Sequence, residues 1–314
     1  MLRRRLKFLA WLVALLAIVF GGSYLFAPQW LMQANFKREA MAAHLETHSV
    51  QTGDSRWVYY EGGKGPTIVL LHGFASDREV WLQVAKLLTP HFHLIIPDLP
   101  GWGDSSRDAN ASYNIDAQAA RLDGFVQTLG LQRFVLVGHS MGGAIAGVYA
   151  SEHPRHVAEL ALVDAFGLKA KGNAYSREVK AGKNPFVFDD RAGFSRLEAL
   201  TFQKPLNLPG RFVDVLVKRN QTDRGFIERT FAELEQPGQT LALQNRLGQL
   251  GMPVLGLWCH DDKIMDISAL DSLRNDLTAA SAISTSTING CDHMPMMEMP
   301  AQTAQILTGF ALSH

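Results

Sequence analysis

The sequence predicts an α/β protein in which a largely parallel sheet carries helices on both faces and an apolar helix precedes the folded domain. Three observations predict this class. Apolar runs of strand type alternate with helical stretches from residue 56 to the end, and residues 165–251 interrupt this alternation with helical patches. The N-terminal stretch is long, apolar and uncharged. Alternating strands and helices are typical of a parallel sheet that is covered on both sides.

Composition limits the classes of function. The chain has 314 residues, of which 47% are hydrophobic, so it can bury one sizeable core. Thirty basic and thirty acidic residues give a formal net charge of zero. This balance argues against a nucleic-acid partner, which requires a positively charged surface. Cys259 and Cys291 are too few for a disulfide framework and lack metal-ligand spacing, so we expect two free thiols in the core.

The N-terminal stretch predicts a transmembrane anchor over residues 1–28. Four basic residues within positions 3–7 precede twenty uncharged residues, 8–27. As a helix these twenty residues would span about 30 Å, the thickness of the hydrocarbon core of a bilayer. A cleaved signal peptide is the alternative, but its small-residue cleavage pattern is hard to place before Pro28. The basic residues before the span predict a cytosolic N-terminus and a domain on the far side of the membrane.

Residues 29–50 predict a juxtamembrane helix. Trp30, Ala34, Met41 and Leu45 fall on one helical stripe, and most charged residues lie elsewhere. The helix is expected to lie along the bilayer, to pack on the following domain, or to pair with a second copy in a homodimer. A plain helical spacer is an equal alternative.

The core of the domain is predicted over residues 51–164 and 252–314. Its strand-like runs are residues 57–60, 67–71, 93–96, 134–137, 160–163, 254–258 and 283–288, and its clearest helical stretches are 79–88, 116–129, 269–277 and 301–310. Residues 165–251 hold no clear strand pattern and are broken by three proline-containing turns. We expect this interval to form a helical cap, inserted after the strand 160–163, which we take as the sixth core strand.

The most informative motif is FVLVGHSMGG, from Phe134 to Gly143. It reads as a strand, a sharp turn and a helix, with Ser140 at the apex of the turn. Gly138 and Gly142 have no side chain to clash in so tight a turn, which would push the serine hydroxyl out above the edge of the sheet. The G-x-S-x-G spacing alone is only moderately specific, and the alternative is a glycine-rich turn with an exposed, inactive serine.

A nucleophilic serine needs a histidine as base and an acid that orients the histidine. Several acidic residues lie just past the strand 254–258, and His293 lies just past the strand 283–288. The candidates for the acid are Asp261, Asp262 and Asp266, with Asp164 after the strand 160–163 as a further one. Gly73 lets the chain bend so that the Phe74 N–H joins the Met141 N–H in an oxyanion hole.

Together these segments resemble the α/β-hydrolase superfamily. The matching motifs are HGF at 72–74, DLPGWGDS at 98–105, GHSMGG at 138–143, the acidic turn at Asp262 and H-x-x-x-x-E-x-P at 293–300. Within the superfamily, the anchor and the segments 144–168 and 212–221 are similar to membrane-anchored monoacylglycerol lipases and related bacterial phospholipases and esterases. The resemblance implies a Ser140, Asp262 and His293 triad in the order typical of this fold.

The resemblance also indicates which of the acidic residues and histidines have catalytic roles and where this chain differs from the family. In the family-like register Asp262 is the acid, because the apolar Ile264 follows it after one residue. We expect His72 and His139 to be structural and the loop 98–105 to be scaffold. The chain departs from the family at Cys259 and Asp292, where glycine is usual.

The expected function is hydrolysis of carboxylic esters of lipid-like substrates, such as monoacylglycerols, lysophospholipids or phospholipids, through an acyl-enzyme. The protein would be a single-pass protein of the bacterial inner membrane, with its catalytic domain in the periplasm and no metal or organic cofactor. Alternatives are a small-ester carboxylesterase, a serine C–C hydrolase of ring-cleavage products and, outside catalysis, an inactive receptor-like module. Dehalogenases and epoxide hydrolases are disfavoured because they resemble this chain but carry aspartate at the nucleophile position.

Overall fold

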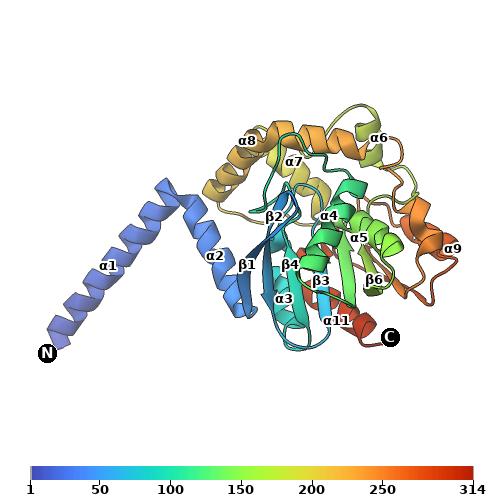
Figure 1. Ribbon diagram of the computed structural model, residues 1–314. Coiled ribbons are helices and arrows are strands. Elements are labelled where there is room, and N and C mark those ends of the chain that lie inside the picture. Colours follow the sequence, from blue (N-terminus) through green and yellow to red (C-terminus); the bar gives the residue numbers. More distant parts are fainter. Residues whose placement is uncertain (1, 314) are drawn as a thin grey trace.

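The centre of the molecule is an eight-stranded sheet with the order β1-β2-β4-β3-β5-β6-β7-β8. The computed structural model describes residues 2–313; residues 1 and 314, the outermost positions of the predicted anchor and core, lie outside it (Figure 1). The strands are β1 (Leu45–Thr52), β2 (Ser55–Gly62), β3 (Thr67–Leu71), β4 (His93–Pro97), β5 (Phe134–His139), β6 (Val157–Val163), β7 (Val254–Cys259) and β8 (Ile283–Ile288). Among the described strands, only the pairs β1–β2 and β2–β4 are antiparallel, so the prediction of a mostly parallel sheet is confirmed.

The two faces of the sheet are covered by different helices. The helices α4 (Ile115–Thr128), α5 (Met141–Glu152) and α9 (Ala269–Asp276) pack on one face, and α3 (Leu82–Leu88) and α11 (Pro300–Ala311) pack on the other. In β5, Leu136 belongs to the first hydrophobic cluster, whereas Val135 and Val137 belong to the second. This alternation is expected for a strand that is buried on both sides.

The N-terminal helix α1 (Leu2–Phe26) projects away from the rest of the molecule (Figure 1). It is long and apolar enough to cross a membrane, and most of its large side chains that the structure describes, such as Phe8 and Trp11, are exposed. At the C-terminal end of α1, the Tyr24 ring contacts the Phe212 ring of the cap, with centroids 5.9 Å apart. A chain that exposes this much apolar surface is expected to cover it with lipid or protein.

The juxtamembrane helix is shorter than predicted. Helix α2 runs from Pro28 to Ala42, and its C-terminal end packs on α3 through Ala40 and Ala43. The predicted end at residue 50 is therefore wrong, because Leu45–Thr52 forms the edge strand β1. A two-residue turn at Gly53, with φ of 55°, joins β1 to β2. The Gly-Asp pair between two strand-like runs is a hairpin signal that could have located β1.

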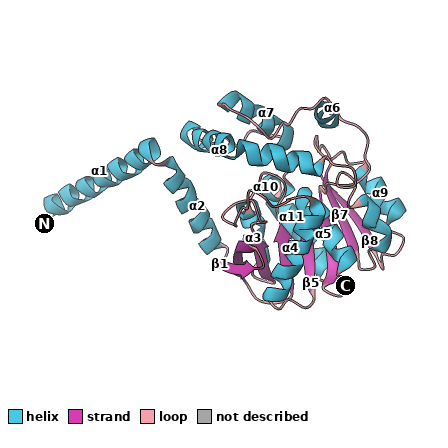
Figure 2. Cartoon of the chain, turned by 45° about the horizontal axis from the view of Figure 1, so that its top comes forward, coloured by secondary structure: helices cyan, strands magenta, loops and turns pink. Residues whose placement is uncertain are grey.

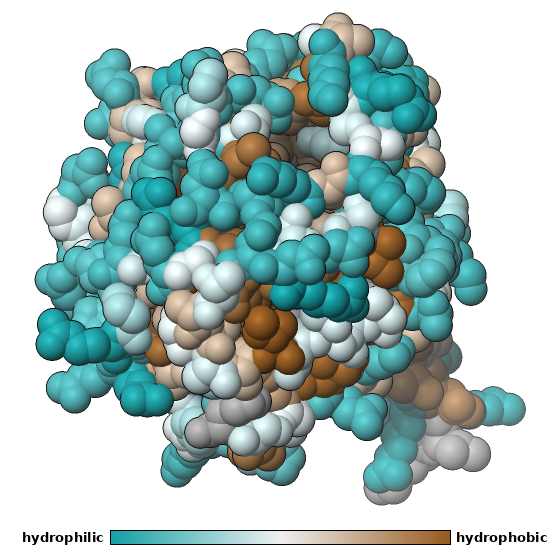
Figure 3. All heavy atoms as spheres, turned by 90° about the vertical axis from the view of Figure 1, so that its right-hand side faces the viewer, coloured by the Kyte–Doolittle hydropathy of each residue, from teal (hydrophilic) through white to brown (hydrophobic). Residues whose placement is uncertain are grey.

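The predicted cap follows the sixth strand. Between β6 and β7 the described chain contains the helices α6 (Ala174–Lys180), α7 (Arg191–Thr201), α8 (Gly210–Leu234), the 3₁₀-helix η2 (Gln244–Gln249) and no strand. Helix α8 lies across the top of the sheet, with α6 and α7 beside it (Figures 1 and 2). The face seen in Figure 3 is mainly hydrophilic, with a hollow near its top at the height of these helices. The cap thus covers the edge where loops after parallel strands usually carry ligand sites.

Candidate active site

Ser140 occupies a strained turn between β5 and α5. Its backbone has φ of 52° and ψ of −119°, a region that residues with a side chain seldom adopt. A Cβ atom on Gly138 would lie 2.2 Å from the Gly142 carbonyl oxygen, and one on Gly142 would lie 2.4 Å from the His72 carbonyl oxygen. Both glycines are thus required by the close approach of backbone, as the motif predicts.

Asp262 and His293 come together from the loops after β7 and β8. The Asp262 Oδ2 atom lies 2.9 Å from His293 Nδ1, and the Asp262 side chain is fully buried. The other carboxylate oxygen accepts hydrogen bonds from the N–H groups of Ile264, at 2.7 Å, and Met265, at 2.9 Å. One oxygen therefore fixes the carboxylate, and the other fixes the orientation of the imidazole.

The backbone of His293 is held from two sides. Its N–H donates to the carbonyl of Thr201 in the cap at 3.0 Å, and its carbonyl accepts from His139 Nε2 at 2.7 Å. Within the described chain no hydrogen bond joins His293 to Ser140. Such bonds often form only in the complex with substrate.

His139 follows the predicted structural role. Burial lowers the pKa of His139 well below its usual value, so its ring is neutral and donates to the His293 carbonyl from Nε2. The residue beside the serine thus connects the nucleophile turn to the histidine loop.

The two predicted oxyanion donors border the same pocket as Ser140. Phe74 follows the bend at Gly73, and Met141 is the first residue of α5. In the described part of the chain, neither of their N–H groups donates to another protein group. Two free N–H groups beside a serine can stabilise negative charge on a substrate oxygen.

His72 joins the loop that carries Phe74 to the loop after β4. Its Nδ1 donates to the Gly73 carbonyl at 2.8 Å, and its Nε2 accepts from the Leu99 N–H at 3.0 Å. Both bonds require a neutral ring, and burial lowers the pKa of His72 to about 4. The loop 98–105 is tied down further by the buried ion pair of Asp98 with Arg78. These contacts agree with the scaffold roles that the sequence indicates.

The other candidate acids face elsewhere or lack contact with the imidazole. Asp261 binds Gln203 Nε2 at 2.7 Å and His260 Nδ1 at 2.8 Å on the surface. Asp266 accepts the Ser268 N–H at 3.0 Å in its own turn. Asp164 is fully buried and accepts the Cys259 N–H at 2.8 Å, and burial next to Asp262 raises its pKa well above the usual value. We infer that Asp164 is neutral.

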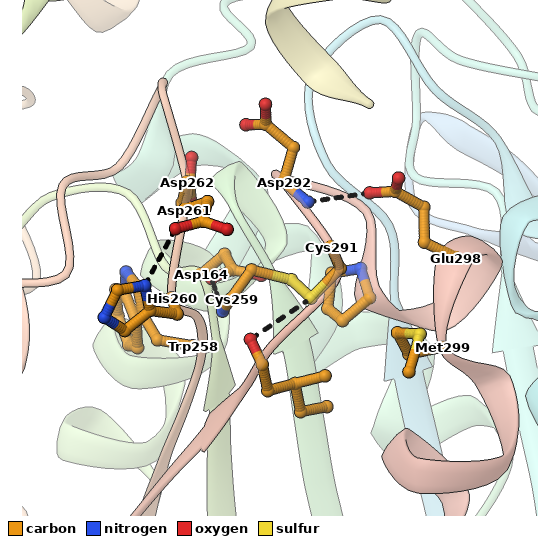
Figure 4. Close-up of a disulfide and its surroundings, with 12 residues drawn as sticks. Asp164, Trp258, Cys259, His260, Asp261, Asp262, Cys291, Asp292, Glu298 and Met299 are labelled. Atoms are coloured by element: carbon orange, nitrogen blue, oxygen red, sulfur yellow. Dashed lines mark hydrogen bonds and ion pairs between the residues drawn. A yellow bond between two sulfur atoms is a disulfide. The ribbon is translucent and has the colours of Figure 1, made fainter. Parts of the chain in front are cut away.

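The expectation of two free thiols is wrong. Cys259 and Cys291 form a disulfide with a Cα–Cα distance of 5.5 Å (Figure 4). Cys259 ends β7, and Cys291 follows the neighbouring strand β8, so the two strands bring the cysteines together. Their positions at the ends of consecutive parallel strands were the signal for this pairing in the sequence.

The pocket beside Ser140 is small and mostly apolar. Its volume is about 20 Å³, room for about one water molecule, so an ester requires movement of the cap or of the lining side chains. The lining residues are Phe74, Ser140, Met141, Phe166, Tyr175, Phe186, Phe231, Leu234, Glu235, Ile264 and Met265.

Of the aromatic residues between Phe186 and Phe212 in the cap, Phe186 alone is among the lining residues of the described pocket. Phe188 and Phe194 instead pack on each other, with ring centroids 5.8 Å apart. Tyr175, Phe231, Leu234 and Glu235 also line the pocket and were not predicted from the sequence. The amphipathic pattern of α8 could have indicated Phe231 and Leu234.

One cluster of potential metal ligands lies apart from this pocket. The ligand atoms of Asp123, His153 and His156 lie within 4.8 Å of one another. His153 Nδ1 is 3.3 Å from Asp123 Oδ1, and His156 Nδ1 is 2.8 Å from the Tyr149 hydroxyl. The three side chains thus have protein partners of their own.

The sheet, the serine at the strand–helix turn and the acid–histidine pair define an α/β-hydrolase. A family model described as alpha/beta hydrolase fold matches residues 66–300, and the chain belongs to this family. The chain is 27% identical to monoacylglycerol lipase ABHD6 of Homo sapiens, over 96% of this chain and 92% of that protein. It is 29% identical to lipase 1 of Psychrobacter immobilis, over 88% and 86% of the two chains.

A similar solved structure is the crystal structure of a membrane phospholipase A described as a bacterial virulence factor. It is 35% identical, covers 97% of both chains and superposes with a TM-score of 0.86. The likeness extends over almost the whole chain, including its N-terminal part.

Proposed function

We propose that this protein hydrolyses carboxylic esters of lipid-like substrates through an acyl-enzyme formed on Ser140. The observation that carries the proposal is the buried hydrogen-bonded pair of Asp262 and His293, which accompanies an apolar pocket that Ser140 lines. The names of the similar proteins, a monoacylglycerol lipase, a lipase and a membrane phospholipase A, support the lipid class.

The proposed reaction follows from the roles of these side chains. The Asp262 contact holds the proton on His293 Nδ1, which leaves Nε2 to take the proton of the Ser140 hydroxyl as its oxygen attacks the ester carbonyl. The N–H groups of Phe74 and Met141 stabilise the oxyanion. His293 then protonates the leaving alcohol, and a water molecule, activated by the same imidazole, releases the acid. No step in this sequence uses a metal or an organic cofactor.

The division of the chain is part of the proposal. Residues 1–28 form the anchor, residues 51–164 and 252–314 the catalytic core, and residues 165–251 a cap that opens to admit substrate. A test panel of acylglycerols, phospholipids and p-nitrophenyl esters, with a ring-cleavage product beside them, separates lipid-ester hydrolysis from C–C hydrolysis.

The apolar lining predicts a preference for longer acyl chains. Each buried CH₂ group contributes about 0.8 kcal/mol, so four more carbons add about 3 kcal/mol, or about a hundredfold in kcat/KM. We expect kcat/KM to rise from acetyl to octanoyl esters. Phe231→Ser should flatten this rise without abolishing acetate cleavage, whereas Phe212→Ser, on the same helix but outside the pocket lining, should not. A flat profile in detergent-solubilised wild type would contradict the lipid class.

We propose that α1 anchors the catalytic domain on the periplasmic side of a bacterial inner membrane, with the N-terminus in the cytosol. Two features support this orientation: the basic residues at positions 3–7, before the apolar helix, and the Cys259–Cys291 disulfide, a bond typical of oxidising compartments. Pairing of two copies through the N-terminal helices would give a homodimer.

The anchor has its own test. The mature protein is expected to begin near Met1 and to remain in the membrane fraction through a carbonate wash. Its cysteines should resist alkylation until a reductant is added to denatured protein. A mature N-terminus near residue 28 would instead indicate a secreted enzyme.

A further inference from the structure

The acid and the histidine of the proposed triad lie on separate loops, so their contact depends on how these loops are held together. Asp262 follows β7, and His293 follows β8. Their hydrogen bond of 2.9 Å is one link between the two loops. Two further links lie on either side of it, and both involve residues where this chain departs from the family pattern.

The first link is covalent. The Cys259–Cys291 disulfide joins the point where the acid loop leaves β7 to the residue two positions before His293 (Figure 4). Both cysteines are fully buried, and the Cys291 sulfur also contacts the Ile288 carbonyl at 3.7 Å. The bond therefore fixes the spacing of the two loops where they begin.

The second link is ionic. Lys263, directly after Asp262, donates its backbone N–H to Asp292 Oδ1 at 2.9 Å and pairs its ammonium group with Asp292 Oδ2. Asp292 directly precedes His293, so the Lys263–Asp292 and Asp262–His293 contacts lie side by side between the same two loops. Lys263 Nζ also donates to the Ala199 carbonyl of the cap at 2.9 Å.

Burial of Asp292 makes its pairing with Lys263 necessary. The Asp292 side chain is fully buried, and burial raises its pKa while the hydrogen bonds from Lys263 oppose that shift. A buried carboxylate without a partner is strongly disfavoured, so Asp292 holds Lys263 in place. The Asp292 N–H donates to Glu298 Oε2 at 2.8 Å and fixes the same loop from its other side (Figure 4).

We propose that the Cys259–Cys291 disulfide and the Lys263–Asp292 pair together position Asp262 against His293 for the reaction. This inference rests on the proposed function. A displacement of about 1 Å in a catalytic group can lower the rate about a hundredfold, so links this close to the triad set its activity. The four residues are positioning residues, and none of them has a role in the chemical steps.

The test compares full-length enzyme variants in detergent with an octanoyl ester at 25 °C. Cys259→Ala with Cys291→Ala, and separately Lys263→Met, are expected to lower kcat about tenfold while KM stays within twofold. The second-order rate of labelling by a fluorophosphonate should fall in parallel. Lys263→Arg, which keeps the charge, should recover at least half of the activity, and Lys64→Met, an exposed lysine far from these loops, should match wild type.

Thermal unfolding separates positioning from simple stabilisation. A lowered Tm with unchanged kcat and labelling rate would overturn the inference. Where an alanine variant does not fold, reduced wild type, with its two thiols counted by alkylation, and Asp292→Asn are measured instead, and unchanged kcat in both overturns it. A wild type that neither cleaves esters nor reacts with the probe would overturn the proposed function and this inference together.

Discussion

Ser140→Ala is expected to lower kcat for every ester substrate by a factor of about 10⁴ to 10⁶ and to abolish fluorophosphonate labelling. Alanine removes the nucleophile and leaves Asp262, His293 and the two oxyanion donors in place. Ser140 is 8% exposed, and the substitution removes only its hydroxyl oxygen, so the fold should persist.

The measurement is steady-state turnover of an octanoyl ester, followed by mass spectrometry of the labelled protein. Ser105→Ala is a matched control, since Ser105 is a buried serine near the same sheet edge. The Ser105→Ala variant should be less stable, because it lacks the hydrogen bond from the Ser105 hydroxyl to the Asp98 carbonyl, but the probe should still label Ser140. Labelling of the Ser140→Ala protein at another residue would assign the role of nucleophile to that residue.

Asp262→Asn is expected to lower kcat by a factor of about 10³ to 10⁴ with little change in KM. The asparagine side chain has nearly the same shape, but it favours the wrong tautomer of His293 and no longer stabilises the imidazolium. Asp261→Asn is the matched control, because Asp261 bonds on the surface to Gln203 and His260 and, among the described residues, has no hydrogen bond to His293. Its kcat should stay within about threefold of wild type.

Asp164→Asn tests the remaining candidate acid. Asp164 is already neutral by our inference, so this variant is expected to keep most of its activity. High activity in the Asp262→Asn enzyme, together with loss of activity in Asp164→Asn, would transfer the orienting role to Asp164.

The parts of this molecule that could be predicted from the sequence depend on local patterns. Ser140 was found because the glycines on either side of it stand at a fixed local spacing, and Gly138 is required by the backbone of Gly142, only four residues further along the chain. The parallel strands were found because strands buried on both faces form continuous apolar runs. Asp262 and His293 were placed near the serine because consecutive parallel strands end at the same edge of the sheet.

The parts that were missed depend on contacts between distant segments. The strand β1 has a mixed polar sequence and forms because it pairs with β2. Its own residues show no clear strand pattern, so the helix before it was predicted to continue to residue 50. The disulfide depends on the neighbouring positions of β7 and β8. The pocket lining at Tyr175 and Phe231 depends on how the cap folds over the sheet, which local periodicity does not specify.

Helix α8 also sets a distance between the membrane and the chemistry. Phe212 at its start contacts Tyr24 of α1, and Phe231 near its end lines the pocket of Ser140. Nineteen residues of helix separate the two by about 28 Å. If α1 spans the bilayer and α8 leads away from the bilayer surface, a lipid must leave its leaflet before its ester bond reaches the serine. Extraction becomes harder with every CH₂ group drawn out of the bilayer, so the enzyme would select lipids by their ease of desorption, and single-chain lipids would reach Ser140 far more often than lipids with two long chains.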